Sequence, residues 1–161
     1  MEAIAGEAGV AVGTLYRHHP TKAALLRAVL ADSATKLAED TEAALEAVRG
    51  GKPPGEALRA LVLTYSERYA DDRAVKSAAA GLGEHVGDDP AGFAEGSPER
   101  RAVAALESLL AEAREAGQVR DDVGLADLVL LLNAVPGPEV EPEVRRRFVE
   151  IVVAGLRAPR A

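Results

Sequence analysis

The stretch "IAGEAGVAVGTLYRHHPTKAALLRAVL", which runs from Ile4 to Leu30, decides the fold of this chain. Two short helical segments are separated by Gly9, and a longer apolar pattern follows Pro20. Glycine permits a tight turn between helices, and the residue before a proline is disfavoured in a helix. The stretch therefore predicts two short helices joined by a tight turn and followed at once by a long helix.

The remainder of the chain has a similar pattern, with apolar residues at helical spacing and breaks at glycine or proline. Thr21 is a suitable N-cap for the long helix, which we expect to end at Gly50. Ser97 and Pro98 form a typical helix start, in which a capping side chain is followed by proline. The sequence thus predicts an all-α protein, with further helices over residues 55–69, 71–82, 98–116, 123–135 and 142–156.

Helical spacing also predicts which side of each helix faces the core. The long helix has an apolar stripe that includes Val29, Leu30 and Leu45. In the next helices the predicted inward residues are Leu58, Leu61, Val62, Tyr65 and Tyr69, followed by Val103, Leu106, Leu110 and Ala113.

The composition favours a globular protein without disulfide or metal-thiolate chemistry. The 161 residues are 48% apolar, 28% charged and 3% aromatic, and they include no cysteine. The longest uninterrupted apolar run, residues 128–132, is far shorter than the roughly 20 residues of a membrane span. The N-terminus has no basic signal-peptide region. We therefore expect a cytoplasmic protein with no membrane partner.

The net charge of −7 argues against a general binder of polyanions. Residues 1–30 carry three basic and two acidic side chains, whereas the remaining residues carry 16 basic and 24 acidic ones. The first thirty residues therefore carry a slight basic surplus, whereas the remaining residues taken together are acidic.

One predicted helix is apolar almost all the way round. Between Leu125 and Val135 only Asp127 and Asn133 are polar, and such a helix is buried on more than one side. Either it is a central core helix, or a second copy of the chain covers its second side, and we favour the homodimer. The final helix adds an apolar side of its own. The expected interface consists of Leu128, Leu131, Leu132, Phe148, Ile151 and Val152.

The first thirty residues resemble the helix-turn-helix of the TetR family of bacterial transcription regulators. The residues that carry the resemblance, at ungapped spacing, are Ile4-Ala5, Ala8-Gly9-Val10, Gly13-Thr14-Leu15-Tyr16, Pro20 and Lys22. The rest of the chain is similar in layout to the helical regulatory domain of that family. The resemblance implies an incomplete DNA-binding domain over residues 1–32 and a helical ligand-binding and dimerisation domain over residues 33–161.

In a helix-turn-helix the second helix lies in the major groove of DNA, with its N-terminal residues at base edges. Val12 and Thr14 are short enough to meet thymine methyl groups or polar base edges, and Gly13 allows a close approach. Tyr16 and Lys22 would reach phosphates. The alternatives are a core role for Tyr16 and a solvated charge at Lys22. The expected DNA-binding residues are Val12, Gly13, Thr14, Tyr16, Arg17, His18 and Lys22.

Three features depart from the family pattern. His19 stands where a core phenylalanine is usual, and Ala11 stands where a capping serine is frequent. Only three residues precede Ile4, so we expect this chain to lack the usual first helix. Two explanations are open: the gene product begins upstream of Met1, or the chain is a truncated ligand-binding and dimerisation module with impaired DNA binding.

The resemblance also implies a small-molecule site inside the helical domain, between the helices over residues 55–69 and 98–116. The residues there are mainly apolar, so a fairly apolar effector is expected, and core packing is their alternative role. The effector would favour a state in which the two recognition helices no longer match major grooves about 34 Å apart, as in a ligand-responsive repressor. The expected ligand-binding residues are Leu61, Tyr65, Tyr69, Leu106 and Leu110.

No pattern in the sequence indicates an enzyme or a cofactor. We find no spacing typical of a nucleophile and its base. Glu84, His85, Asp88 and Asp89 lie in a glycine-rich segment. A metal site needs three or four convergent ligands, so a solvated loop is the better interpretation of this segment. We expect neither catalysis nor a cofactor.

Overall fold

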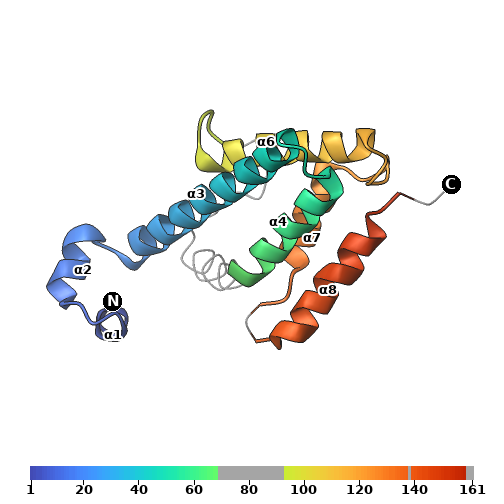
Figure 1. The fold of residues 1–161 in the computed structure, drawn as a ribbon. Coiled ribbons are helices and arrows are strands. Elements are labelled where there is room, and N and C mark those ends of the chain that lie inside the picture. Colours follow the sequence, from blue (N-terminus) through green and yellow to red (C-terminus); the bar gives the residue numbers. More distant parts are fainter. Residues whose placement is uncertain (69–92, 138, 159–161) are drawn as a thin grey trace.

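A single long helix, α3 (Lys22–Arg49), joins two unequal parts of the protein (Figure 1). The short helices α1 (Glu2–Glu7) and α2 (Val12–His18) lie beyond its N-terminal end, and the later helices gather around its C-terminal half. With 28 residues at about 1.5 Å each, α3 is roughly 40 Å long. It therefore holds α1 and α2 well away from the larger helical bundle.

The computed structural model describes residues 1–68, 93–137 and 139–158. The predicted helix over residues 71–82, Tyr69 and the candidate metal segment around His85 lie outside these residues. The regular secondary structure of the described part is α-helical, which confirms the predicted fold class. Besides α3, the helices are α1 (Glu2–Glu7), α2 (Val12–His18), α4 (Pro54–Arg68), α6 (Pro98–Glu115), α7 (Leu125–Ala134) and α8 (Pro142–Gly155).

The helix ends follow the predicted capping chemistry. Thr21 Oγ1 accepts a hydrogen bond from the amide of Ala24 at 3.0 Å, and Ser97 Oγ accepts one from Arg100 at 3.2 Å. Each hydroxyl satisfies an amide that the first turn of a helix leaves without a partner. At its other end α6 gives way to Gly117, whose φ of 64° is readily adopted only by glycine. Local sequence therefore sets where α3 and α6 begin and where α6 ends.

The main core lies where α3, α4 and α6 meet. The C-terminal half of α3 contributes Leu45 and Val48, and α4 contributes Leu58. Leu109 and Leu110 of α6 are at most 1% exposed and occupy the same cluster. The burial of these aliphatic side chains is the main source of stability for the bundle.

A second, smaller cluster holds α8 against α4. Val62 of α4 packs with Val149 and Val153 of α8 and with Val135, which follows α7. Leu132 of α7 and Phe148 of α8 lie against this cluster and are partly buried. Helix α8 is therefore attached to the bundle mainly through α4, whereas α7 contacts both α4 and α6.

The inward faces of two helices differ from the sequence prediction. In α6, Leu106, Leu110 and Ala113 are buried as predicted, but Leu109 is fully buried as well. Because α6 contacts both α3 and α4, its buried surface is wider than a single stripe. In α3 the predicted Val29 is 39% exposed, since it lies in the part of the helix that extends away from the bundle.

The apolar residues of α8 are divided between two surfaces, and its buried valines are not among the residues that the sequence predicts for this helix. Val149, Val153 and Leu156 are buried, whereas Ile151 is 67% exposed and Val144 is 46% exposed. The valine pair faces α4, and the other surface of the helix faces outward.

Among the described helices, none is long and apolar enough to cross a membrane.

Leu109→Ala should lower the free energy of unfolding by about 2–5 kcal/mol, because it leaves a cavity in a fully packed core. Urea denaturation followed by circular dichroism measures the change. Ile4→Ala is the control: Ile4 is 38% exposed and outside both clusters, so its effect on the main transition should stay within about 0.5 kcal/mol. Equal effects of the two substitutions would contradict this assignment of the core.

Candidate nucleic-acid interface

The turn between α1 and α2 is closed by backbone hydrogen bonds. The amide of Gly9 donates to the carbonyl of Gly6 at 3.2 Å, and the amide of Val10 donates to that of Ala5 at 3.0 Å. Gly9 has a φ of 66°, which explains why glycine suits this turn. Ala5, only 3% exposed, is the buried contact of α1. The two short helices therefore form a helix-turn-helix.

Helix α2 presents its side chains to solvent. Val12 is 40% exposed and Tyr16 is 46% exposed, so Tyr16 has no core role among the described residues. The extended backbone of Ala11 precedes the helix, and alanine has no side-chain oxygen with which to cap it. The predicted DNA-binding residues are all exposed: Val12, Gly13, Thr14, Tyr16, Arg17, His18 and Lys22.

The junction between α2 and α3 places Lys22 beside α2. His19 ends α2, and its amide donates to the carbonyl of Leu15 at 2.8 Å. Thr21 then caps α3, so Lys22 is the first residue of that helix and its side chain is exposed. His19 is half-buried, which agrees with its place at a position that is usually part of the core.

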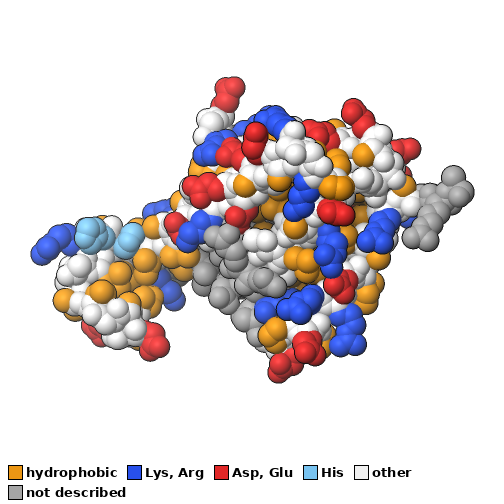
Figure 2. Space-filling view, in the orientation of Figure 1, with side chains coloured by type: hydrophobic (Ala, Val, Ile, Leu, Met, Phe, Trp, Pro, Cys, Tyr) orange, Lys and Arg blue, Asp and Glu red, His pale blue; other side chains and the backbone are white. Residues whose placement is uncertain are grey.

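The charged side chains of this part favour an anionic partner near α2. Arg17 and His18 lie in the last turn of α2, whereas Glu2 lies in the first turn of α1. Figure 2 shows histidine and basic side chains at the outer tip formed by α2, with acidic side chains at the opposite edge of the α1 region. A duplex that approached α2 would thus meet its basic side first.

An apolar surface also remains open beside the helix-turn-helix. Ile4 and Val29 are 38% and 39% exposed, and Val10 is 44% exposed. Leu15 of α2 and Leu26 of α3 are half-buried. The apolar side chains of α1 and α2 are therefore less completely covered than those of the helices in the bundle.

The predicted ligand-binding residues that the structure describes lie in the core. Leu61, Leu106 and Leu110 belong to the main cluster and are at most 7% exposed. Tyr65 is half-buried against the second cluster. The structure therefore brings three of these residues together and places the fourth on the adjoining cluster.

The predicted interface residues divide between core and surface. Leu128 is 1% exposed and belongs to the main cluster. Leu130, which is not among the predicted interface residues, is 68% exposed, and Ile151 is 67% exposed. The remaining predicted residues are partly buried: Leu131, Leu132, Phe148 and Val152.

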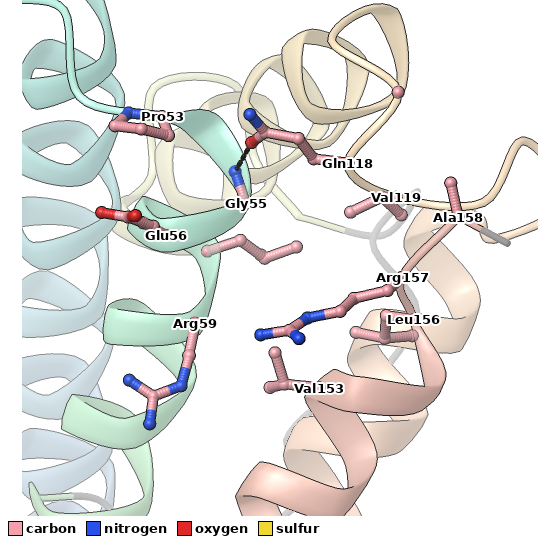
Figure 3. Close-up of a pocket in the computed structure, with 12 residues that line it drawn as sticks. Pro53, Gly55, Glu56, Arg59, Gln118, Val119, Val153, Leu156, Arg157 and Ala158 are labelled. Carbon is pink, nitrogen blue, oxygen red and sulfur yellow. Dashed lines mark hydrogen bonds between the residues drawn. The ribbon is translucent and has the colours of Figure 1, made fainter. Parts of the chain in front are cut away.

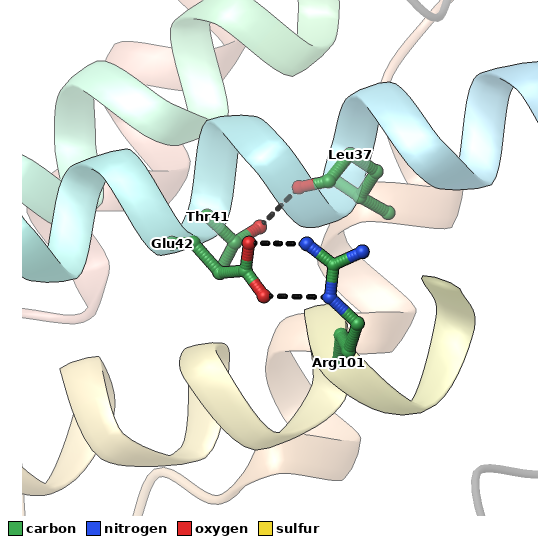
Figure 4. A network of polar contacts seen from close by, with 4 residues as sticks. All are labelled: Leu37, Thr41, Glu42 and Arg101. Carbon is green, nitrogen blue, oxygen red and sulfur yellow. Dashed lines mark hydrogen bonds and ion pairs between the residues drawn. The ribbon is translucent and has the colours of Figure 1, made fainter. Parts of the chain in front are cut away.

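A bidentate ion pair joins α3 to α6 across the surface of the bundle (Figure 4). Arg101 Nε and Nη2 donate to the carboxylate of Glu42 at 2.9 and 2.6 Å. Hydrogen bonding to Arg101, with its charge, lowers the pKa of Glu42. The adjacent Thr41 is buried and donates its hydroxyl to the carbonyl of Leu37 at 2.7 Å. Glu42 and Thr41 both lie on α3, the helix that leads to α2.

Sequence reasoning missed the ion pair because its partners are 59 residues apart. Each residue alone is one of many charged positions on an exposed helix face. No local spacing relates Glu42 to Arg101, and only the packing of α3 on α6 brings them together.

Comparisons with known proteins agree with this arrangement. Residues 1–29 match the family model of the bacterial regulatory proteins of the tetR family, and residues 53–158 match the C-terminal domain of SbtR-like transcriptional regulators. A TetR transcription regulatory protein from Mycobacterium vanbaalenii is 33% identical, with a TM-score of 0.65 over 97% of this chain and 81% of that chain.

A TetR transcriptional regulator from Streptomyces coelicolor is 27% identical, with a TM-score of 0.55 over 99% of this chain and 87% of that chain. Among curated proteins, no sequence matches the chain. Two family models and two solved structures therefore agree on one family.

The ion pair should contribute to stability in a pH-dependent way. In a double-mutant cycle of Glu42→Gln and Arg101→Met, we expect favourable coupling at pH 7. Because the pair lowers the pKa of Glu42 below its ordinary value of 4.5, the coupling should be lost as the pH falls through that lowered pKa. Denaturation curves across this pH range measure it.

The control cycle uses Glu46 and Arg49, whose 3.3 Å contact lies within α3. Since both members of that pair are on one helix, the pair does not join α3 to α6, and weaker coupling is expected. A coupling of Glu42 and Arg101 that is unchanged by acid would contradict the assignment of this contact as an ion pair.

Proposed function

The chain belongs to the TetR family of bacterial transcription regulators, and we propose that it acts as a homodimeric, ligand-responsive repressor. The observation that carries the DNA-binding part of the proposal is the exposed α2, presented at the far end of α3. A helix in this position is free to enter the major groove without contact between the bundle and the duplex.

The two ends of α2 have different parts in this proposal. Val12 and Thr14, in its first turn, contact base edges and so select the DNA sequence. Tyr16, Arg17, His18 and the adjoining Lys22 contact phosphates, which position the protein on any sequence. The exposure of all these side chains supports the assignment.

A homodimer would present two such helices to successive major grooves. The exposed Leu130 of α7 and Ile151 of α8 support an interface over these two helices. Leu132 and Phe148 lie at the edge of the cluster that holds α7 and α8 to α4. The interface would then be continuous with the core, as in dimers that are stable only when associated.

Helix α3 would link an effector to α2. The proposed effector site lies between α4 and α6, near Leu61, Leu106 and Leu110, which pack in the cluster that also holds Leu45 of α3. An apolar molecule that enters there must displace these side chains, and α3 would move with α6 through the Glu42 contact. The spacing of the two α2 helices would then depend on the ligand.

Lys22→Ala should weaken binding to all DNA sequences similarly and reduce the salt dependence of binding by about one ion per site, because it removes a phosphate contact. Thr14→Val should instead change the preferred sequence. Fluorescence anisotropy at several salt concentrations, with duplexes selected by the protein from a random pool, measures both effects.

Lys52→Ala is the control for Lys22→Ala, since Lys52 is an exposed lysine in the loop between α3 and α4, far from α2. Its effect on DNA affinity should be small. Failure of the protein to select any duplex from the pool would contradict the proposal and favour a ligand-binding and dimerisation module with impaired DNA binding.

Ile151→Glu should separate the dimer, because it places a charge in an apolar interface that should bury more than about 1,000 Å² in total. Sedimentation equilibrium at micromolar concentration measures the association. The matched control, Ile4→Glu, introduces the same charge at an exposed isoleucine outside α7 and α8 and should leave the dimer intact. A monomeric unmodified protein would refute the interface.

A further inference from the structure

A cleft opens at the end of the bundle farthest from α2, where the first turns of α4 face the C-terminal end of α8 (Figure 3). Its volume is about 380 Å³, within the range of about 300–1,000 Å³ that is usual for small-molecule sites. The loop after α6, with Gly117, Gln118 and Val119, forms its third wall. The residues assigned to the proposed effector site, including Leu61 and Leu106, are not among those that line this cleft.

Contacts between the three walls hold the cleft in shape. The amide of Gly55 in α4 donates to Gln118 Oε1 at 2.6 Å, and the amide of Arg120 donates to the carbonyl of Leu156 at 3.0 Å. Arg59 of α4 forms an ion pair with Glu150 of α8 at 2.8 Å. Each wall is thus bonded to both others, so little ordering of the protein is required when a ligand binds.

Gly55 is needed for the first of these contacts. A Cβ at this position would lie 2.9 Å from Gln118 Oε1 and 3.1 Å from Gln118 Cβ. A side chain at position 55 would therefore displace Gln118 from its present position.

The floor of the cleft is apolar. Leu58, Val119, Val153 and Leu156 line it, and each is at most 7% exposed as a residue. These side chains belong to or adjoin the core, so they are fixed in position. A hydrocarbon chain or ring that covers this floor gains the usual free energy of apolar burial.

The rim of the cleft carries two guanidinium groups and one carboxylate. Arg59 is already paired with Glu150, which leaves Arg157 as the available cation. Figure 3 shows the Arg157 side chain extending from the end of α8 across the cleft toward α4. Among the described residues no carboxylate pairs with Arg157. Glu56, on the α4 side, is the acidic group of the rim.

We propose that this cleft binds a small amphipathic carboxylate, whose apolar body covers Leu58 and Val153 while its carboxylate accepts hydrogen bonds from Arg157. A planar guanidinium matches a carboxylate in geometry and charge. An uncharged molecule of the same shape gains only the free energy of covering the apolar floor. An amine also covers the floor, but its positive charge is repelled by Arg157. The site is separate from the proposed effector site and depends on neither DNA binding nor dimerisation.

The test uses octanoate as the probe, with octan-1-ol and octylamine as matched molecules of the same chain length. In ¹H–¹⁵N spectra of the whole chain, octanoate should shift the amides of Gly117, Gln118 and Val119 saturably, with a dissociation constant in the millimolar range or tighter. Octan-1-ol and octylamine should both bind more weakly than octanoate, because neither carries an anionic group for Arg157.

Arg157→Gln should weaken octanoate about tenfold, since it removes the charge but keeps a polar side chain at an exposed position. Glu56→Gln should tighten binding, because it removes the repelling carboxylate. Arg146→Gln, at an exposed arginine of α8 that does not line the cleft, should leave the affinity unchanged.

The proposal is overturned by equal affinity for octanoate and octan-1-ol, by an Arg157→Gln variant that binds octanoate as the unmodified chain does, or by shifts confined to amides near Leu61 and Leu106. The last outcome would assign the probe to the region between α4 and α6. It would leave the proposal of a ligand-responsive regulator unaffected and would show that the cleft does not bind the probe.

Discussion

The packing of the C-terminal half of α3 along α6 is the contact on which the rest of the protein depends. Leu45 and Val48 have to be covered, and Leu109 and Leu110 of α6 cover them together with α4. Because α3 is one continuous helix, burying this half fixes the direction of the other half. Helix α3 is about 40 Å long, and α2 lies beyond its N-terminal end. Apolar contacts made inside the bundle therefore set the position of α2.

Exposure of apolar side chains has a different meaning in each part of the protein. Around α2, the exposed Val12 and the neighbouring polar residues suit the edges of bases, which offer methyl groups as well as hydrogen-bonding atoms. On α7 and α8, Leu130 and Ile151 are about two-thirds exposed and are adjacent to a packed cluster. Such side chains are better suited to a partner of similar composition than to solvent.

Polar contacts in the described part of the bundle join its helices at the periphery. Glu42 and Arg101 connect α3 to α6, while Arg59 and Glu150 connect α4 to α8. Exposed pairs of this kind contribute little to overall stability. They do restrict how one helix shifts against another, and in the cleft between α4 and α8 they leave Arg157 as the cation available to an outside molecule.

The sequence by itself determined the helices, because capping and helix-breaking are local: Thr21 and Ser97 begin α3 and α6, and Gly9 shapes the turn before α2. It also determined the helix-turn-helix, whose residues are close together in the chain. Tertiary structure alone decided which apolar side chains are covered, and so it buried Leu128 while exposing Leu130. It alone brought together Glu42 with Arg101 and Gly55 with Gln118, since residues so far apart meet only when helices pack.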